Sequence, residues 1–256
     1  MQRCNFQRDG LTLSYLDAGG GGSALVALHS HWMEGLTFAP LGLALAPQWR
    51  VIALDQRGHG HSDHPPTYTR EDYVEDVSAL FAHLGLGKAV VLGNSLGGVN
   101  AYQFAARHPS RVRALIVADI GAEIGDDTAF ALAWGGTFAT KDELAERIGP
   151  RFFPYLQDSV RHTQDGWRLA FEPREMVMSQ SHLNGNHWED WLASDCPALL
   201  LRGRQSRVTA QEQIQQMAAR RPHTHLKCLE GGHILHVDNS IAFTDSVKVF
   251  LDSLAE

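Results

Sequence analysis

Short apolar runs rich in β-branched residues alternate along this chain with longer segments of helical periodicity. A strand buried on both faces appears as a continuous apolar run, whereas a helix covering a sheet repeats its apolar residues every three or four positions. Repeated units of this kind predict an α/β fold with a mainly parallel sheet and helices on both faces. The expected strands cover residues 11–16, 24–28, 51–54, 88–92, 112–118, 198–201 and 226–229, and the expected helices 38–46, 69–87, 97–107, 210–220 and 241–254.

The alternation stops between Asp126 and Trp191, in a segment rich in Phe and Trp whose pattern is predominantly helical. Connections longer than about 15 residues are uncommon in compact domains unless they carry structure or function of their own. We therefore expect residues 126–191 to form a helical cap inserted over the sheet. Residues 1–125 and 192–256 are expected to form the core, so the chain is one large domain with an insertion.

Composition argues against several classes of function. The 256 residues include 22 basic and 29 acidic side chains, a net charge of −7, with no basic tract to attract a nucleic acid. The first ten residues are polar, and no run approaches the roughly 18 apolar residues that span a bilayer, so we expect neither a signal peptide nor a membrane partner. The three cysteines (Cys4, Cys196 and Cys228) are far apart, which favours reduced thiols in a cytoplasmic protein.

The hexapeptide GNSLGG at residues 93–98 fits the pattern G-x-S-x-G and lies between an expected strand and an expected helix. A sharp strand-to-helix turn exposes the hydroxyl of its central serine, and only glycine leaves room on either side. The following helix directs its first N–H groups toward a negative charge that develops on a substrate oxygen. A plain glycine-rich turn is the alternative interpretation, but this placement favours Ser95 as a nucleophile.

Four sequence blocks, taken together, resemble the α/β-hydrolase family. LHSH at residues 28–31 stands where the family usually has L-H-G-x, and DQRGHGHSD at residues 55–63 resembles its D-x-R-G-H-G-x-S loop. The serine elbow follows, and EGGH at residues 230–233 resembles the late block that carries the catalytic histidine. The resemblance implies the α/β-hydrolase fold and serine hydrolase chemistry, with no cofactor and no metal.

The resemblance implies that His233 is the base, since it directly follows two glycines after the last expected strand. A serine is a weak nucleophile until such a base accepts its proton. His236 also lies late in the chain, but we expect it near a helix or at the rim of the site. The other histidines are less suited by position, and His29 is expected to be a structural hydrogen-bonding residue.

The acid is where this sequence departs most from the family. The usual G-x-x-D motif after the penultimate strand reads GRQS, so Ser206 occupies the position of the carboxylate. A serine has no charge with which to stabilise an imidazolium. A subset of relatives instead carries the acid at the end of the preceding strand, where Asp119 stands 24 residues after Ser95. Asp119 is the expected acid, with Glu123 as the alternative.

The oxyanion hole is expected to consist of the backbone N–H groups of Leu96 and His31, by their positions in the matched blocks. Ser30 departs from the usual glycine at its position. If that position requires a positive φ, a serine costs about 1 kcal/mol, or the loop bends differently. The identity of the second donor therefore stays open.

The expected activity is hydrolysis of a small-to-medium carboxylic ester or lactone, a small-molecule substrate, through an acyl-enzyme. Aromatic residues of the cap supply an apolar lining, of which Phe130, Trp134 and Phe138 are the expected substrate-binding residues, with Phe152 and Phe153 as further candidates. Internal packing of the cap is an equally good account of any one of them. The sequence fixes neither the substrate nor the oligomeric state.

Three alternatives remain. HGHSDH at residues 59–64 also fits H-x-H-x-D-H, in which His59, His61, Asp63 and His64 would bind zinc for a metal-dependent hydrolysis. Carbon–carbon bond hydrolases of the same fold also carry an asparagine before the serine, as Asn94 does here. A non-catalytic binding protein that keeps the same pocket is the third alternative.

Overall fold

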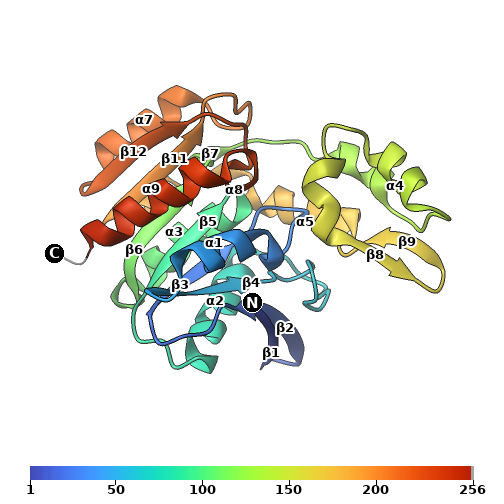
Figure 1. Ribbon diagram of the computed structural model, residues 1–256. Coiled ribbons are helices and arrows are strands. Elements are labelled where there is room, and N and C mark those ends of the chain that lie inside the picture. Colours follow the sequence, from blue (N-terminus) through green and yellow to red (C-terminus); the bar gives the residue numbers. More distant parts are fainter. Residues whose placement is uncertain (255–256) are drawn as a thin grey trace.

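The computed structural model describes residues 1–254 and, within them, an eight-stranded sheet in the order β1-β2-β4-β3-β5-β6-β11-β12 (Figure 1). β1 pairs antiparallel with β2, and β2 with β4, while the remaining neighbours are parallel. The mainly parallel sheet is the one that the sequence predicts. Its strands are β1 (Gln2–Arg8), β2 (Leu11–Asp17), β3 (Ser23–Leu28), β4 (Trp49–Leu54), β5 (Ala89–Asn94), β6 (Val112–Ala118), β11 (Ala198–Gly203) and β12 (Thr224–Leu229).

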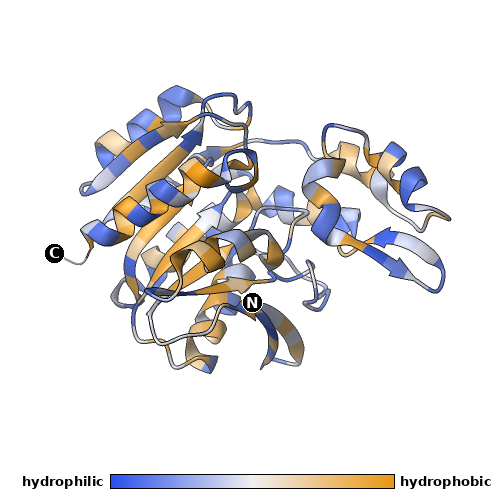
Figure 2. Cartoon of the chain, viewed as in Figure 1, coloured by the Kyte–Doolittle hydropathy of each residue, from blue (hydrophilic) through white to orange (hydrophobic). Residues whose placement is uncertain are grey.

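Helices cover the sheet on both faces because successive residues of each buried strand point to opposite sides. Val91 belongs to the cluster that includes residues of α2, α3 and α7, whereas Leu92 belongs to the cluster with α1 and α9. In Figure 2 the central strands are mostly hydrophobic, and the outer helices alternate between hydrophobic and hydrophilic residues. The helices of this core are α1 (Ala39–Leu45), α2 (Arg70–His83), α3 (Leu96–Arg107), α7 (Gln211–Arg220), α8 (Leu235–Asp238) and α9 (Ser240–Ser253), with short 3-10 turns η1 (Gly35–Phe38) and η2 (Pro109–Arg111).

The sequence analysis missed strand β1. Its residues QRCNFQR are mostly polar, and of them only Phe6 is buried. An edge strand with a single buried side chain produces no apolar run, so periodicity alone does not distinguish it from a loop.

Residues 126–191 are here called the cap segment, and their middle part, residues 141–169, lies beside the sheet rather than within its layers (Figure 1). Besides the helices that the sequence predicts, the segment contains an antiparallel hairpin of β8 and β9, which the sequence analysis did not predict. At the C-terminal end of the segment, α6 packs against α3 of the core, and Trp191 of α6 is fully buried. The elements here and at the base of the segment are β7 (Glu123–Ile124), η3 (Ala129–Trp134), α4 (Lys141–Ile148), η4 (Phe153–Ser159), β8 (Val160–Thr163), β9 (Gly166–Leu169), α5 (Pro173–Leu183), β10 (Gly185–Asn186) and α6 (Trp188–Leu192).

The cap segment is joined to the core directly at the loop that follows β3. The Ser159 hydroxyl donates a hydrogen bond to the carbonyl oxygen of Trp32 at 2.8 Å. The guanidinium of Arg161 forms an ion pair with the buried carboxylate of Glu34. Both contacts link the beginning of the β8–β9 hairpin to one short loop of the core.

No helix among residues 1–254 is long and apolar enough to cross a membrane.

Candidate active site

Ser95 occupies a strained turn between β5 and α3. Its φ of 54° and ψ of −119° lie outside the regions that non-glycine residues normally adopt. A Cβ on Gly93 would lie 2.0 Å from the carbonyl oxygen of Gly97, and one on Gly97 would lie 2.1 Å from that of Leu28. The two glycines of G-x-S-x-G are therefore required by contact with the backbone, and together they allow the chain to turn at Ser95.

Asp119 and His233 meet at the carboxyl ends of the parallel strands. Asn94 is paired with Ala118 in the register of β5 and β6, so Ser95 and Asp119 each follow one member of the same pair. His233 comes from the loop after β12, and its Nδ1 lies 2.7 Å from Oδ2 of Asp119. Asp119 is fully buried, and it has a positive φ of 50°, which aspartate tolerates better than most residues.

The Asp119 carboxylate is held by three donors. Its Oδ1 accepts a hydrogen bond from the backbone N–H of Gly203 at 3.0 Å. Its Oδ2 accepts one from His233 Nδ1 and another from the hydroxyl of Ser206. Ser206, which stands where the family usually has its acid, therefore contacts the carboxylate that lies against the histidine.

The alternatives to Asp119 and His233 lie elsewhere. Glu123 accepts a hydrogen bond from the indole Nε1 of Trp188 at 2.8 Å and is engaged at the base of the cap segment. His236 is buried against Phe38, with ring centroids 4.6 Å apart, and its Nε2 is 2.8 Å from the hydroxyl of Thr37. Burial lowers the pKa of His236 to about 3. Neither residue lines the pocket that contains Ser95.

The two expected oxyanion donors lie on different elements, His31 in the loop after β3 and Leu96 at the start of α3. Within residues 1–254 the backbone N–H groups of Leu96 and His31 have no backbone acceptor, and of the two residues His31 lines the pocket. Ser30 has no positive φ; the left-handed residue of this loop is Trp32, with φ of 69°. The serine therefore fits without the strain that the sequence raised as a possibility, because the bend lies two residues later.

Two histidines of this loop are neutral because burial lowers their pKa values. For His29 the pKa falls to about 4. Its Nδ1–H donates to the Ser30 carbonyl at 2.7 Å, and its Nε2 accepts from the backbone N–H of Gln56 at 3.0 Å, so it is the structural hydrogen-bonding residue expected from the sequence. Burial and the neighbouring His59 also lower the pKa of His31, whose Nε2 contacts the hydroxyl of Ser179 in α5 at 2.8 Å.

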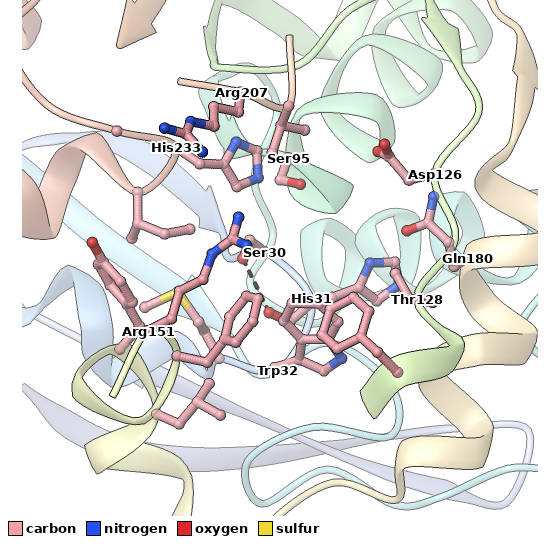
Figure 3. Close-up of a pocket in the computed structure, with 18 of the residues that line it drawn as sticks. Ser30, His31, Trp32, Ser95, Asp126, Thr128, Arg151, Gln180, Arg207 and His233 are labelled. Carbon is pink, nitrogen blue, oxygen red and sulfur yellow. Dashed lines mark hydrogen bonds between the residues drawn. The ribbon is translucent and has the colours of Figure 1, made fainter. Parts of the chain in front are cut away.

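A cavity of about 610 Å³ contains Ser95 and His233, and both side chains face its open space (Figure 3). Of the three expected substrate-binding residues, only Phe130 lines it. Trp134 is buried behind it, against Phe130 and Trp32, and Phe138 lies outside, where its backbone bonds to Trp167. The lining also includes residues that the sequence analysis did not single out: Tyr155 of η4, Gln180 of α5, and, from loops, Trp32, Asp126, Arg151, Gln205 and Arg207.

The histidines of the H-x-H-x-D-H pattern do not converge. His59 is buried, with Nδ1 2.9 Å from the carbonyl oxygen of Arg57, and Asp63 accepts the backbone N–H of Thr12 at 2.7 Å. His64 instead pairs with Glu175 of α5 at 2.6 Å. Within residues 1–254 no group of three or more His, Cys, Asp or Glu side chains is arranged to hold a metal ion.

Comparison with known proteins identifies the class to which this fold and site belong. Residues 18–240 match the family described as the alpha/beta hydrolase fold, so the chain belongs to this family of hydrolases. The sequence resemblance and the predicted fold class are thereby confirmed.

Individual relatives act on small molecules. The chain is 36% identical over 217 residues to 2-(acetamidomethylene)succinate hydrolase of Mesorhizobium japonicum, covering 79% of this chain and 78% of the relative. It is 28% identical over 226 residues to 3-oxoadipate enol-lactonase 2 of Acinetobacter baylyi, covering 78% of each. A crystal structure of E-2-(acetamidomethylene)succinate hydrolase superposes with a TM-score of 0.87 at 23% identity, covering 98% of this chain and 99% of that chain, a likeness of fold.

Proposed function

We propose that this chain is a serine hydrolase that cleaves a carboxylic ester or lactone of small to medium size. The observation that carries the proposal is the 2.7 Å contact between His233 Nδ1 and the buried Asp119 carboxylate, beside a pocket that also contains the strained Ser95. A strained nucleophile, a histidine and an orienting carboxylate together make up the acyl-transfer constellation.

In the proposed mechanism, Ser95 Oγ attacks the substrate carbonyl as His233 Nε2 accepts its proton. Asp119 holds the proton on Nδ1, which keeps Nε2 free to act as a base and stabilises the imidazolium that forms. The N–H groups of Leu96 and His31 donate to the oxyanion of the tetrahedral intermediate. His233 then passes the proton to the leaving group, and a water molecule repeats the sequence on the acyl-enzyme.

One contact of the proposed mechanism is not formed in this structure, because no hydrogen bond joins Ser95 to His233 within the described residues. Such contacts commonly tighten only when the substrate binds. The backbone of His233 is held by the side-chain amide of Asn94. This amide donates hydrogen bonds to the carbonyl oxygens of Ala118 at 2.9 Å and His233 at 3.1 Å. The histidine loop is thereby held against the strand that carries the nucleophile.

The activities of these two relatives support a small-molecule substrate, and one of the relatives is a lactonase. The aromatic lining at Trp32, Phe130 and Phe152 supports a substrate with apolar parts. These observations favour an ester or lactone over a polymer.

The test is covalent labelling with a fluorophosphonate, followed by turnover of 4-nitrophenyl esters of graded acyl length. Wild-type protein is expected to be labelled at Ser95 and to release nitrophenol. Ser95→Ala is expected to be folded by circular dichroism, to resist labelling and to lose several orders of magnitude in kcat. Unchanged turnover by folded Ser95→Ala would overturn the assignment of the nucleophile.

A further inference from the structure

Two arginines line the pocket and have no partner of opposite charge. No ion pair and no side-chain hydrogen bond within residues 1–254 involves the guanidinium of Arg151 or Arg207. Most arginines of this chain, by contrast, bond to a carboxylate, a carbonyl or an amide, as Arg57 and Arg161 do. Guanidinium groups in a cavity, left without protein acceptors, are available to an anion from outside.

Arg151 is held in place by an aromatic surface. Its guanidinium carbon lies 5.1 Å from the ring centroid of Phe152, within the range of a cation–π contact. Phe152 is itself fixed, with Phe130 stacked on it at 5.2 Å and Trp32 against its edge at 5.9 Å. A guanidinium stacked on a ring keeps its N–H edge free, which is the edge that binds a carboxylate with two parallel hydrogen bonds. Figure 3 shows Arg151 reaching from the cap segment into the pocket.

The acidic residues of the pocket leave this charge uncompensated. Asp127 uses Oδ1 to accept the backbone N–H of Ala129 at 2.8 Å, a local turn contact. Asp126 lies across the pocket from Arg151, beside Gln180 in Figure 3, and burial raises its pKa. Neither carboxylate forms an ion pair with an arginine within the described residues. The chain as a whole carries a net charge of −7, so an anionic ligand gains its attraction from these local arginines and not from the overall field.

We propose that Arg151 is the carboxylate-binding residue of the substrate pocket and that the substrate is an ester or lactone that bears a free carboxylate. The inference rests on the proposed function, since it places the scissile carbonyl at Ser95. The carboxylate lies against Arg151 while the carbon chain contacts Trp32 and Phe152. Arg207, on the loop that carries Ser206, adds a second positive charge to the same cavity.

The test compares pairs of substrates that differ only in charge. Half-esters of glutaric, adipic and pimelic acid with 4-nitrophenol carry one carboxylate at three distances from the carbonyl. The matched neutral ester of each has an isopropyl group in place of the carboxylate, which conserves shape. Kinetic constants are measured for wild type, for Arg151→Met and for Arg174→Met. Methionine keeps an unbranched stem for packing on Phe152, and Arg174 is an exposed arginine of α5 that does not line the pocket.

Wild type is expected to prefer at least one half-ester over its neutral match by about 10-fold or more in kcat/KM, since charge-assisted hydrogen bonds are worth about tenfold to a hundredfold. Arg151→Met is expected to remove this preference by raising KM for the half-ester, and to leave the neutral ester within about 2-fold. Arg174→Met is expected to behave as wild type. Equal or better turnover of the neutral ester at all three lengths, or an equal loss for both esters in Arg151→Met, would overturn the proposal.

A binding measurement separates this proposal from the proposed function. Titration calorimetry of the Ser95→Ala protein with adipate, with and without Arg151→Met, reports carboxylate binding when no turnover takes place. Binding that Arg151→Met weakens about 10-fold or more supports the subsite even if Ser95 is not the nucleophile. Adipate binding that does not depend on Arg151 contradicts the subsite even if Ser95 is the nucleophile.

Discussion

At the scale of single residues, the unusual feature of this site is that its carboxylate follows β6, while a serine stands where the family usually has its acid. Asp119 follows β6, and Ser206 follows β11, the neighbouring strand. Because the two strands are parallel and adjacent, their ends approach the same histidine from two sides. The serine at position 206 is not inert, since its hydroxyl donates to Asp119 Oδ2.

We predict that Asp119→Asn lowers kcat by about 10⁴, because an amide favours the wrong tautomer of His233. Ser206→Ala removes one of three donors to the carboxylate but no charge, so we expect a far smaller loss, about 10-fold or less. Both are measured as kcat on the best ester, with thermal unfolding as the control for folding. If Ser206→Ala lowered kcat as much as Asp119→Asn does, the assignment of Asp119 as the acid and Ser206 as a donor to its carboxylate would be contradicted.

Much of this arrangement is predictable from sequence because it depends on local rules. The elbow at residues 93–98 has a motif that requires glycine by steric contact, and the carboxyl ends of parallel strands bring Asp119 close to Ser95. The lining of the pocket is not predictable in the same way. Arg151 and Trp32 lie in loops, whose positions are set by tertiary contacts and not by a period in the sequence. Phe138, which the sequence suggested as a substrate contact, packs beneath Arg147 instead, with the guanidinium carbon 5.6 Å from its ring centroid.

At the scale of elements, the cap hairpin and the loop after β3 are coupled through a buried charge. Glu34 is 2% exposed and lies between Arg161 of β8 and Arg3 of β1, at 3.6 Å from the latter. Burial raises the pKa of Glu34 to about 7, although both arginines act in the opposite direction. Two residues before Glu34 in the chain, the Trp32 carbonyl accepts the hydrogen bond from Ser159. The position of the cap segment and the conformation of the expected oxyanion loop therefore depend on the same contacts.

We predict that Glu34 makes the stability of the chain fall with rising pH between about 4.5 and 7, its ordinary pKa and its raised one. In this window the folded chain retains a proton on Glu34 that the unfolded chain has lost, so the free energy of unfolding decreases as the pH rises. The slope for one full proton is about 1.4 kcal/mol per pH unit. Glu34→Gln cannot ionise and is expected to lack this contribution.

The measurement is the urea midpoint of wild type and Glu34→Gln at several pH values from 5 to 8. The midpoint of the wild type is expected to decline relative to that of the variant as the pH rises. The matched control is Glu172→Gln, which removes an exposed carboxylate of the cap segment that pairs with Arg168 at 3.0 Å. Parallel curves for wild type and Glu34→Gln would show that Glu34 ionises no differently in the folded and unfolded chains.

At the scale of the whole molecule, the strand–helix alternation was sufficient to predict the sheet, its parallel centre and the covering helices. The departures lie at the periphery. β1 is an edge strand with one buried residue, and the β8–β9 hairpin is a partly buried pair within a segment whose residue pattern suggested helix. Peripheral elements bury little surface, so their residues are less constrained by hydrophobic pattern than those of the core.

The arrangement of the whole molecule also argues against a zinc site at residues 59–64. The loop of residues 55–64 is used to hold the core together: His59 lies against His29 with ring centroids 4.9 Å apart, and Asp63 binds the backbone of β2. Burial lowers the pKa of His59, so this histidine is neutral at physiological pH, but within residues 1–254 it belongs to no group of three side chains that could hold a metal ion. We therefore predict that exhaustive treatment with a strong chelator leaves ester turnover unchanged. Elemental analysis of the active protein is expected to find less than about 0.1 zinc per chain, an order-of-magnitude bound for a site without converging ligands.

His64→Ala is the informative variant, because it removes a potential ligand whose only bond in the described chain is to Glu175, and it is expected to retain wild-type activity. Two metals per chain, with activity lost on chelation and in His64→Ala, would make the zinc mechanism the better account.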